Sequence, residues 1–402
     1  MKRTNLENWI CEAEGLPALS RKSIETLQLE RLNALLCREK ARGGFYADLP
    51  ASLGSLKELA DLPFTTPKQL AECGERMLLV SQSSVCRVIT DATSGTTGAA
   101  KRVFYTEKDC QNTVEFFAAG LSELVFPKDT VMIAMPFSGP FGLGELIAEA
   151  IEKLGARPLK AGVGRTFGEL SDILEEEKPG AYVGMPAQFL SLLRFCGRKS
   201  LRRALVSGDA CPKIVLTEAE KLLGSRLFPH YGLRETALGC AVTCPAHEGM
   251  HLRENHIIAE IVGEDGKPVP DGEAGELCLT TIGMEAQPLI RYRTGDRARI
   301  LPDPCPCGGV TKRIDGISRS FAASLEELDG ALFSLPRLVD YRAEREGDAL
   351  RISVLNNGAP CSDEIRAAAE RICPRLAVTV SERPCRKEDV PSYLGKRHLA
   401  GT

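Results

Sequence analysis

Thr93-Ser94-Gly95-Thr96-Thr97-Gly98-Ala99-Ala100-Lys101 is the most informative segment of this 402-residue chain. Two glycines within a run of hydroxyl residues predict a loop whose backbone N–H groups and side chains can surround a polyphosphate, with the lysine closing over it. A Walker A loop is excluded, because that pattern requires Gly before the lysine and Ser or Thr after it, whereas Lys101 lies between Ala100 and Arg102. Taken alone, the segment is also compatible with a solvent-exposed turn.

The chain around this segment alternates short apolar runs with amphipathic stretches. The four runs predicted to be buried strands are residues 130–136, 181–186, 203–209 and 226–232. The stretches between them are predicted to be helices, and such alternation is typical of a mostly parallel sheet covered on both faces. The first ninety residues are predicted to be mainly helical, with one helix ending at Gly43-Gly44.

The pattern changes after residue 250. Apolar segments at 256–263, 275–281 and 297–302 are separated by turn residues, which predicts an antiparallel or barrel-like part. The last eighty or so residues are predicted to form a small α+β module. We therefore expect an α/β protein with a large amino-terminal domain (1–316) and a small carboxy-terminal domain (317–402).

Composition limits the function classes. The 51 Lys and Arg residues nearly balance the 54 Asp and Glu residues, giving a net charge of −3, which argues against a nucleic-acid or anionic-membrane partner. The 15 cysteines are scattered, the first residues are charged and polar, and no apolar run is long enough to cross a bilayer. We expect a cytoplasmic protein whose thiols are mostly reduced and packed in the core.

Three motifs in order carry a resemblance. The segment 93–101, then Tyr231-Gly232-Leu233-Arg234-Glu235, then 288–296 (PLIRYRTGD) resemble the adenylate-forming (AMP-binding) ligase superfamily. Two features are similar to the phenylacetate–CoA ligase-like branch of this superfamily. One is the segment 63–70 (PFTTPKQL), and the other is the RYRTGD segment with a CxCG motif after it. Each motif alone has a simpler explanation: Asp296 suits a turn, and Glu235 suits a helix start.

The resemblance implies a nucleotide site. The residues it assigns to the phosphates of ATP are Thr93, Ser94, Gly95, Thr96, Thr97, Gly98 and Lys101. Tyr231 and Gly232 would lie at the adenine, Asp296 would accept hydrogen bonds from the ribose hydroxyls, and Glu235 would hold Mg²⁺. Ser207, Gly208 and Asp209 would line the adenine pocket, and Arg313 is also implied in nucleotide binding. Lys396 resembles the terminal lysine that contacts the reacting carboxylate and the α-phosphate; the alternative is a solvated charged tail.

A second group of residues predicts a structural zinc site. Cys244, His251, Cys305 and Cys307 supply three thiolates and one imidazole, a closed tetrahedral set. His247 competes with His251 as the fourth ligand, and the likeness to the phenylacetate–CoA ligase-like branch favours His251. Scattered core cysteines with a surface histidine are the alternative.

The function implied is ATP-dependent activation of a carboxylic acid, by default aromatic, to an acyl-adenylate, followed by transfer to CoA. Residues 135–142 are a candidate wall of the acid pocket. The chain departs from the family pattern at Arg234, and at Gly316-Ile317-Ser318-Arg319, where a G-R-x-D hinge is expected. The altered hinge motivates one alternative, an adenylating enzyme with a non-CoA acceptor (a protein thiol or an amine). A second alternative is a nucleotide-binding member without ligase chemistry. The resemblance also suggests a homodimer.

Overall fold

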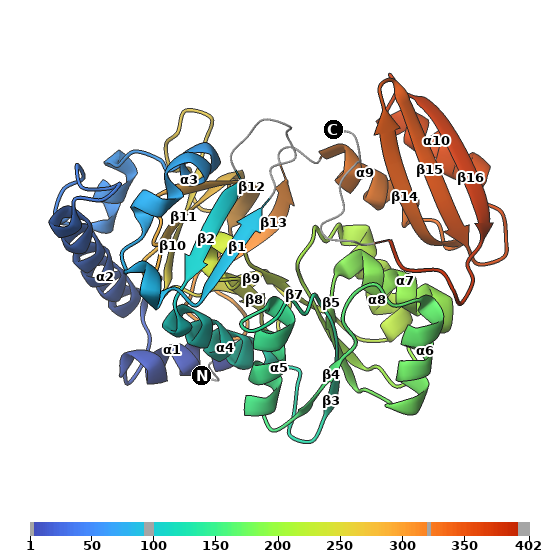
Figure 1. The fold of residues 1–402 in the computed structure, drawn as a ribbon, viewed down its shortest axis with the longest axis horizontal. Helices are drawn as coiled ribbons and strands as arrows, with labels where there is room; N and C mark the ends of the chain where they lie inside the picture. The colour runs from blue at the N-terminus through green and yellow to red at the C-terminus, as the bar shows by residue number, and fades with distance from the viewer. Residues whose placement is uncertain (1–3, 92–99, 320–322, 393–402) are drawn as a thin grey trace. The chain divides into compact units, whose positions relative to one another are not determined.

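The computed structural model describes residues 4–91, 100–319 and 323–392 (Figure 1). These residues divide into two compact units, each built from two segments that are distant in the sequence. The first unit takes its described residues from 4–123 and 230–319, and the second from 124–229 and 323–392. Among the described residues, no helix combines the length and the apolar character that crossing a bilayer requires.

The second unit contains the parallel sheet that the sequence predicts. Its strands are β3 (Thr130–Ala134), β4 (Arg157–Lys160), β5 (Ala181–Gly184), β6 (Arg203–Val206) and β7 (Phe228–Tyr231), in the order β4-β3-β5-β6-β7. All neighbouring pairs run parallel. The sequence pattern did not reveal β4, because none of its four residues is fully buried.

Helices connect successive strands of this sheet. They are α5 (Leu143–Lys153), α6 (Phe167–Glu176), α7 (Pro186–Cys196) and α8 (Lys213–Leu223). Local sequence sets their ends: Thr166 and Glu169 form a capping box at the start of α6, and Pro186 occupies the first turn of α7. Gly224 ends α8 in a left-handed conformation that glycine adopts without strain.

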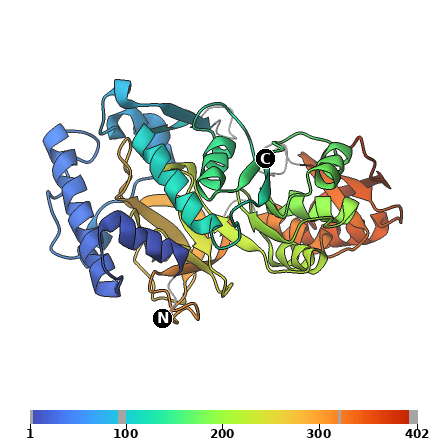
Figure 2. The same ribbon diagram turned by 90° about the horizontal axis from the view of Figure 1, so that it is seen from below.

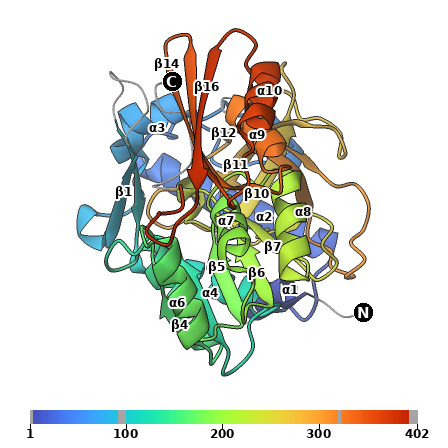
Figure 3. The ribbon, with the colours of Figure 1, turned by 90° about the vertical axis from the view of Figure 1, so that its right-hand side faces the viewer.

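The carboxy-terminal module also belongs to the second unit. It comprises α9 (Ala323–Leu332), β14 (Leu338–Glu346), β15 (Ala349–Asn356), α10 (Ser362–Ile372) and β16 (Ala377–Pro384), with α10 packed on β16 (Figure 3). β15 pairs antiparallel with β14 and parallel with β16. The predicted domain boundary at residue 316 stays a prediction.

This module shares one hydrophobic core with α7 and α8. Leu328 and Phe333 of the module belong to the same buried cluster as Phe189. The guanidinium of Arg194, on α7, donates to the carbonyl oxygens of Phe333, Leu335 and Leu338 at 2.7, 3.2 and 2.7 Å. The module is therefore held by both apolar burial and directed hydrogen bonds.

The first unit contains the antiparallel part that the sequence predicts. Its strands are β8 (Ala241–Thr243), β9 (Met250–Leu252), β10 (Ile257–Val262), β11 (Gly275–Thr281), β12 (Tyr292–Ile300) and β13 (Arg313–Arg319). They pair in the order β10-β11-β12-β13-β9-β8, and every pair is antiparallel. The last residues of β7, His230 and Tyr231, pair with β8.

Amino-terminal elements complete the first unit. The helices are α1 (Asn5–Glu14), α2 (Arg21–Arg42), α3 (Pro67–Cys73) and α4 (Glu107–Leu121), and the short 3₁₀ turns are η1 (Leu56–Asp61), η2 (Gly74–Met77), η3 (Gln82–Ser84) and η4 (Arg234–Thr236). β1 (Arg87–Asp91) and β2 (Lys101–Tyr105) form an antiparallel hairpin. α1 packs against α4 (Figure 2). α2 ends at Gly43, as the sequence predicts.

Candidate active site

The predicted phosphate loop, Thr93 to Gly98, lies outside the described residues, but the strands on either side of it are defined. Asp91 at the end of β1 pairs with Lys101 at the start of β2. The amine of Lys101 lies 2.5 Å from Oε1 of Glu235, and both side chains are largely buried.

Glu235 lies on the 3₁₀ turn η4 and is 5% exposed. The hydroxyl of Tyr292 donates to its Oε1 at 2.7 Å, beside the contact from Lys101. Burial alone would raise the pKa of this carboxyl, but the charge and hydrogen bond of Lys101, with the hydrogen bond of Tyr292, lower it below its usual value. Glu235 is therefore a carboxylate at neutral pH, the form that binds a hard cation.

Tyr292 was not assigned a role from the sequence. It is the first residue of β12. The segment 63–70 holds the backbone on both sides of it, because Thr65 exchanges backbone hydrogen bonds with Arg291 and Arg293 at 3.0 and 2.9 Å. Tyr292 and Asp296 are both buried, on either side of an irregular stretch of β12 that includes Gly295. The segment RYRTGD itself was recognised from the sequence, but nothing in it distinguished Tyr292 as a partner of Glu235.

Tyr231 and Asp296 form a second hydrogen-bonded pair. The Tyr231 hydroxyl donates to Oδ2 of Asp296 at 2.7 Å. Burial, with the nearby Asp296 charge, raises the pKa of Tyr231 well above its ordinary value, so the phenol stays neutral. A side chain at Gly232 would place its Cβ 2.0 Å from the carbonyl oxygen of Leu238, so this position requires glycine.

The other predicted nucleotide residues have different positions. Ser207, Gly208 and Asp209 belong to the second unit and follow β6, where Gly208 has a φ of 87° and approaches Met135. Lys396 lies outside the described residues. Arg313 is buried at the start of β13, where its guanidinium donates to the carbonyl oxygens of Glu248 and Asp303. Its role in nucleotide binding stays a prediction, and these contacts instead fix the loop beside the cysteine cluster.

The predicted zinc ligands come together in the first unit. One ligand atom from each of Cys244, His251, Cys305 and Cys307 lies within 4.8 Å of the others. The sulfurs of Cys244 and Cys305 are 3.6 Å apart, and the Cys307 sulfur is 3.4 Å from Nε2 of His251. Tetrahedral zinc with Zn–S bonds of about 2.3 Å separates two sulfurs by about 3.8 Å, so the donor set fits this ion. His247 does not belong to the cluster that the described residues form.

Two of the thiols in this cluster, those of Cys244 and Cys307, are poorly ionised without a cation. Burial, together with the neighbouring thiols, raises the pKa of Cys244 and of Cys307. A bound divalent cation reverses that preference, because a coordinated thiol loses its proton. Cys240, which the sequence assigned to the core, is fully buried.

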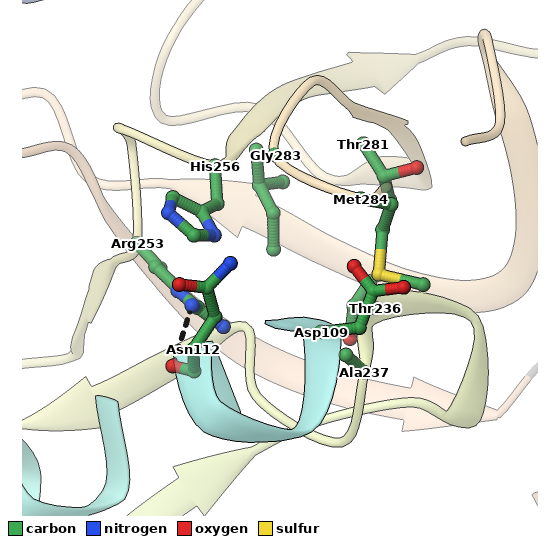
Figure 4. Close-up of a pocket in the computed structure, with 10 residues that line it drawn as sticks. Asp109, Asn112, Thr236, Ala237, Arg253, His256, Thr281, Gly283 and Met284 are labelled. Carbon is green, nitrogen blue, oxygen red and sulfur yellow. Dashed lines mark hydrogen bonds between the residues drawn. The ribbon is translucent and has the colours of Figure 1, made fainter. Parts of the chain in front are cut away.

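A small cavity in the first unit lies among α4, β11 and the turn at Arg253 (Figure 4). Its volume of about 10 Å³ is enough for about one water. The Arg253 guanidinium lies within 5.3 Å of the Trp9 ring and 5.1 Å of the Phe116 ring, and it donates to the Asn112 carbonyl at 2.7 Å. We assign this cavity to packing, because none of the predicted nucleotide residues that the structure describes lines it.

Comparison with known proteins places the chain in a family. Residues 88–285 match the family of AMP-binding enzymes. The phenylacetate-coenzyme A ligase of Escherichia coli (strain K12) is 31% identical over 282 residues, which are 67% of this chain and 63% of that protein. The phenylacetate-coenzyme A ligase of Aromatoleum evansii is 30% identical over 310 residues, 72% of this chain and 70% of that protein. This chain belongs to the AMP-binding enzyme family, in its phenylacetate–CoA ligase branch.

The fold agrees with this membership. A solved structure of 2-hydroxyisobutyryl-CoA ligase in the postadenylation state has a TM-score of 0.76 at 19% identity, covering 94% of this AMP-binding enzyme and 90% of that chain. At this identity the likeness concerns the fold: a large α/β amino-terminal region with a smaller carboxy-terminal domain, as the sequence predicts. The chain spans less than two thirds of the E. coli relative's length.

Proposed function

We propose that this enzyme is an AMP-forming carboxylate–CoA ligase. It activates a carboxylic acid with ATP, releases pyrophosphate, and transfers the acyl group from the adenylate to CoA. The single observation that supports the assignment best is the buried contact of Lys101 and Tyr292 with Glu235, because it joins three separate motif segments at one carboxylate. Membership in the phenylacetate–CoA ligase branch supports the same reaction.

Each charged group has a defined task in this proposal. Glu235 would hold Mg²⁺, which would supply charge neutralisation at the phosphates. Lys101, which pairs with Glu235, would contact the β- and γ-phosphates. Asp296 exchanges its bond from Tyr231 for bonds from the ribose hydroxyls. Lys396 neutralises the charge that develops when the carboxylate attacks the α-phosphate.

We propose an aromatic acid as the substrate class. In the second unit, β3 and β5 flank the point where strand order reverses, and ligands of open α/β sheets bind at the carboxyl ends of strands there. Met135 and Met185 follow these two strands directly, and a Cβ at Gly208 would lie within 4 Å of both side chains. These apolar groups, continued by the segment 135–142, suit a flat hydrophobic acyl group.

We propose that the cluster of Cys244, His251, Cys305 and Cys307 binds a structural zinc ion. Four protein ligands leave no position for water, so the ion stabilises the loops and takes no part in the reaction. Replacing Cys305 and Cys307 by Ser should abolish zinc content and lower the melting temperature. Unchanged metal content in that double variant would contradict the zinc site.

One assay tests the ligase reaction and its rival. Carboxylate-dependent ATP–pyrophosphate exchange is measured over a panel of aromatic and aliphatic acids, and thioester formation is measured with and without CoA. We expect exchange with at least one aromatic acid, thioester only with CoA, and loss of both in Lys396→Ala and Glu235→Gln. Lys387→Ala, at an exposed lysine of the same module, is the matched control. Exchange without thioester would favour a non-CoA acceptor, which the altered segment 316–319 motivates.

A further inference from the structure

We propose that Glu7, on the amino-terminal helix α1, is a positioning residue for the metal cluster. It acts through Thr311 and fixes His251 in the tautomer whose Nε2 is free to bind the ion. The inference rests on the proposed zinc site and adds residues to it that lie outside the ligand set. Glu7 is separated from the nearest ligand by more than two hundred residues of sequence.

A continuous chain of hydrogen bonds connects these residues. Nδ1 of His251 lies 2.8 Å from the hydroxyl of Thr311, and that hydroxyl lies 3.1 Å from Oε1 of Glu7. The same carboxylate oxygen accepts from the backbone N–H groups of Val310 and Thr311, at 2.5 and 2.7 Å. Glu7, His251 and Thr311 are 1%, 1% and 4% exposed, so water does not compete for these bonds.

The direction of each bond follows from the number of protons available. Oε1 of Glu7 is an acceptor in all three contacts, so the single hydroxyl proton of Thr311 points to Glu7. The hydroxyl oxygen must then accept from Nδ1–H of His251. A neutral imidazole protonated at Nδ1 carries its lone pair on Nε2. Nε2 is the atom that faces the Cys307 sulfur at 3.4 Å, so the chain leaves the metal-facing nitrogen unprotonated.

The local backbone is built around this contact. Glu7 occupies the third position of α1, and its own N–H bonds the hydroxyl of Thr4 at the helix cap, which fixes the start of the helix. A Cβ at Gly309 would lie 3.0 Å from Oε1 of Glu7, 3.0 Å from Cε1 of His251 and 3.2 Å from the Cys307 sulfur. Glycine therefore allows carboxylate, imidazole and thiol to converge on one loop.

A simpler role is that Glu7 only holds the loop at Val310 and Thr311 by its two backbone bonds. That role predicts a change in stability but none in the His251 tautomer. Outer-sphere partners of ligating histidines typically contribute 10- to 100-fold in metal affinity. The tautomer and the zinc affinity together separate the two roles.

The experiment uses the full chain with zinc alone as the probe. We measure zinc affinity by competition with a chromogenic chelator for the wild type, Glu7→Ala, Thr311→Val and Thr311→Ser. Glu12→Ala, at an exposed carboxylate on the same helix, is the control. We expect 10- to 100-fold weaker zinc binding in Glu7→Ala and Thr311→Val, and near wild-type affinity in Thr311→Ser and in the control.

The second readout is ¹⁵N NMR of the histidine side chains in metal-free protein. We expect the His251 signal to report protonation at Nδ1 in the wild type and in Thr311→Ser, and a mixture of tautomers in the near-isosteric Thr311→Val, which keeps the side-chain volume. A wild type that binds one zinc with unchanged affinity in Glu7→Ala and Thr311→Val overturns this inference alone, as does protonation of His251 at Nε2. A wild type that takes up no zinc overturns the proposed zinc site itself.

Discussion

Glu39 of α2 gives a specific prediction for stability, because burial disfavours the charge of its carboxylate. The side chain is fully buried. Burial raises the pKa of Glu39 to about 7, although the charges of Arg42 and Arg38 act in the opposite direction. The position in the last turn of the helix adds to the cost, because the carboxyl end of a helix disfavours negative charge.

The sign and size of the effect follow from proton linkage. The pKa is about 7 in the folded state and close to 4.5 when unfolded, so between these values only the unfolded state loses the proton. The contribution of Glu39 to the free energy of unfolding is therefore fully present below pH 4.5 and is lost as the pH rises through 7. The whole shift corresponds to about 3 kcal/mol, most of which falls between pH 5 and pH 8.

Glu39→Gln removes the charge while keeping the shape. The new amide brings an unsatisfied donor whose cost is the same at every pH, so the comparison between two pH values isolates the carboxylate. Relative to the wild type, we expect the variant to gain about 2 to 3 kcal/mol in free energy of unfolding between pH 5 and pH 8. Urea unfolding at the two pH values measures this free energy. The signal is the fluorescence of Trp9, which is the single tryptophan and belongs to the same unit as Glu39.

Glu30→Gln, at an exposed position of the same helix, is the control and should show no such gain. Equal pH dependence in the wild type and Glu39→Gln would refute the reasoning, because it would mean that the folded protein ionises Glu39 as readily as the unfolded chain does.

Three further predictions concern the site and the second unit. Tyr292→Phe removes the hydroxyl that bonds Glu235, and we expect a several-fold higher Mg²⁺ requirement in ATP–pyrophosphate exchange; an unchanged Mg²⁺ titration would contradict this. Gly232→Ala would place its Cβ 2.0 Å from the Leu238 carbonyl, and we expect a melting temperature several degrees lower with loss of exchange, measured by calorimetry and the same assay. Arg194→Met leaves three carbonyls of the carboxy-terminal module without their donor, and we expect faster limited proteolysis of that module at a cost of roughly 3 kcal/mol or more.

The sequence predicted those parts of the fold whose apolar pattern is strong. The runs at 130–136 and 181–186 are β3 and β5, where nearly every residue is buried, so a continuous apolar run was enough to reveal them. β4 was missed because two of its four residues are exposed and the other two are only partly buried, so it has no apolar run. The hairpin of β1 and β2 was also missed, because each strand has only five residues and no regular alternation of polar and apolar side chains.

Site residues were predictable where they lie in short, recognisable sequence motifs. Glu235, Tyr231 and Asp296 lie in recognisable segments, and the structure pairs each of them with another motif residue. Glu7 was not predictable, because its role arises from a contact with Thr311, which lies 304 residues away in the sequence. A single glutamate in a helix start carries no signal by itself.

The core shared by α7, α8 and the carboxy-terminal module has a consequence for synthesis. The apolar faces of α7 and α8 leave the ribosome first, and the residues that cover them, including Leu328 and Phe333, follow roughly a hundred residues later. At elongation rates of about 5 to 20 residues per second, this interval lasts on the order of ten seconds, during which the nascent chain displays an uncovered hydrophobic surface. The second unit should therefore complete its folding only after translation has passed α9, and an early stop before that helix should yield an aggregation-prone fragment that chaperones hold.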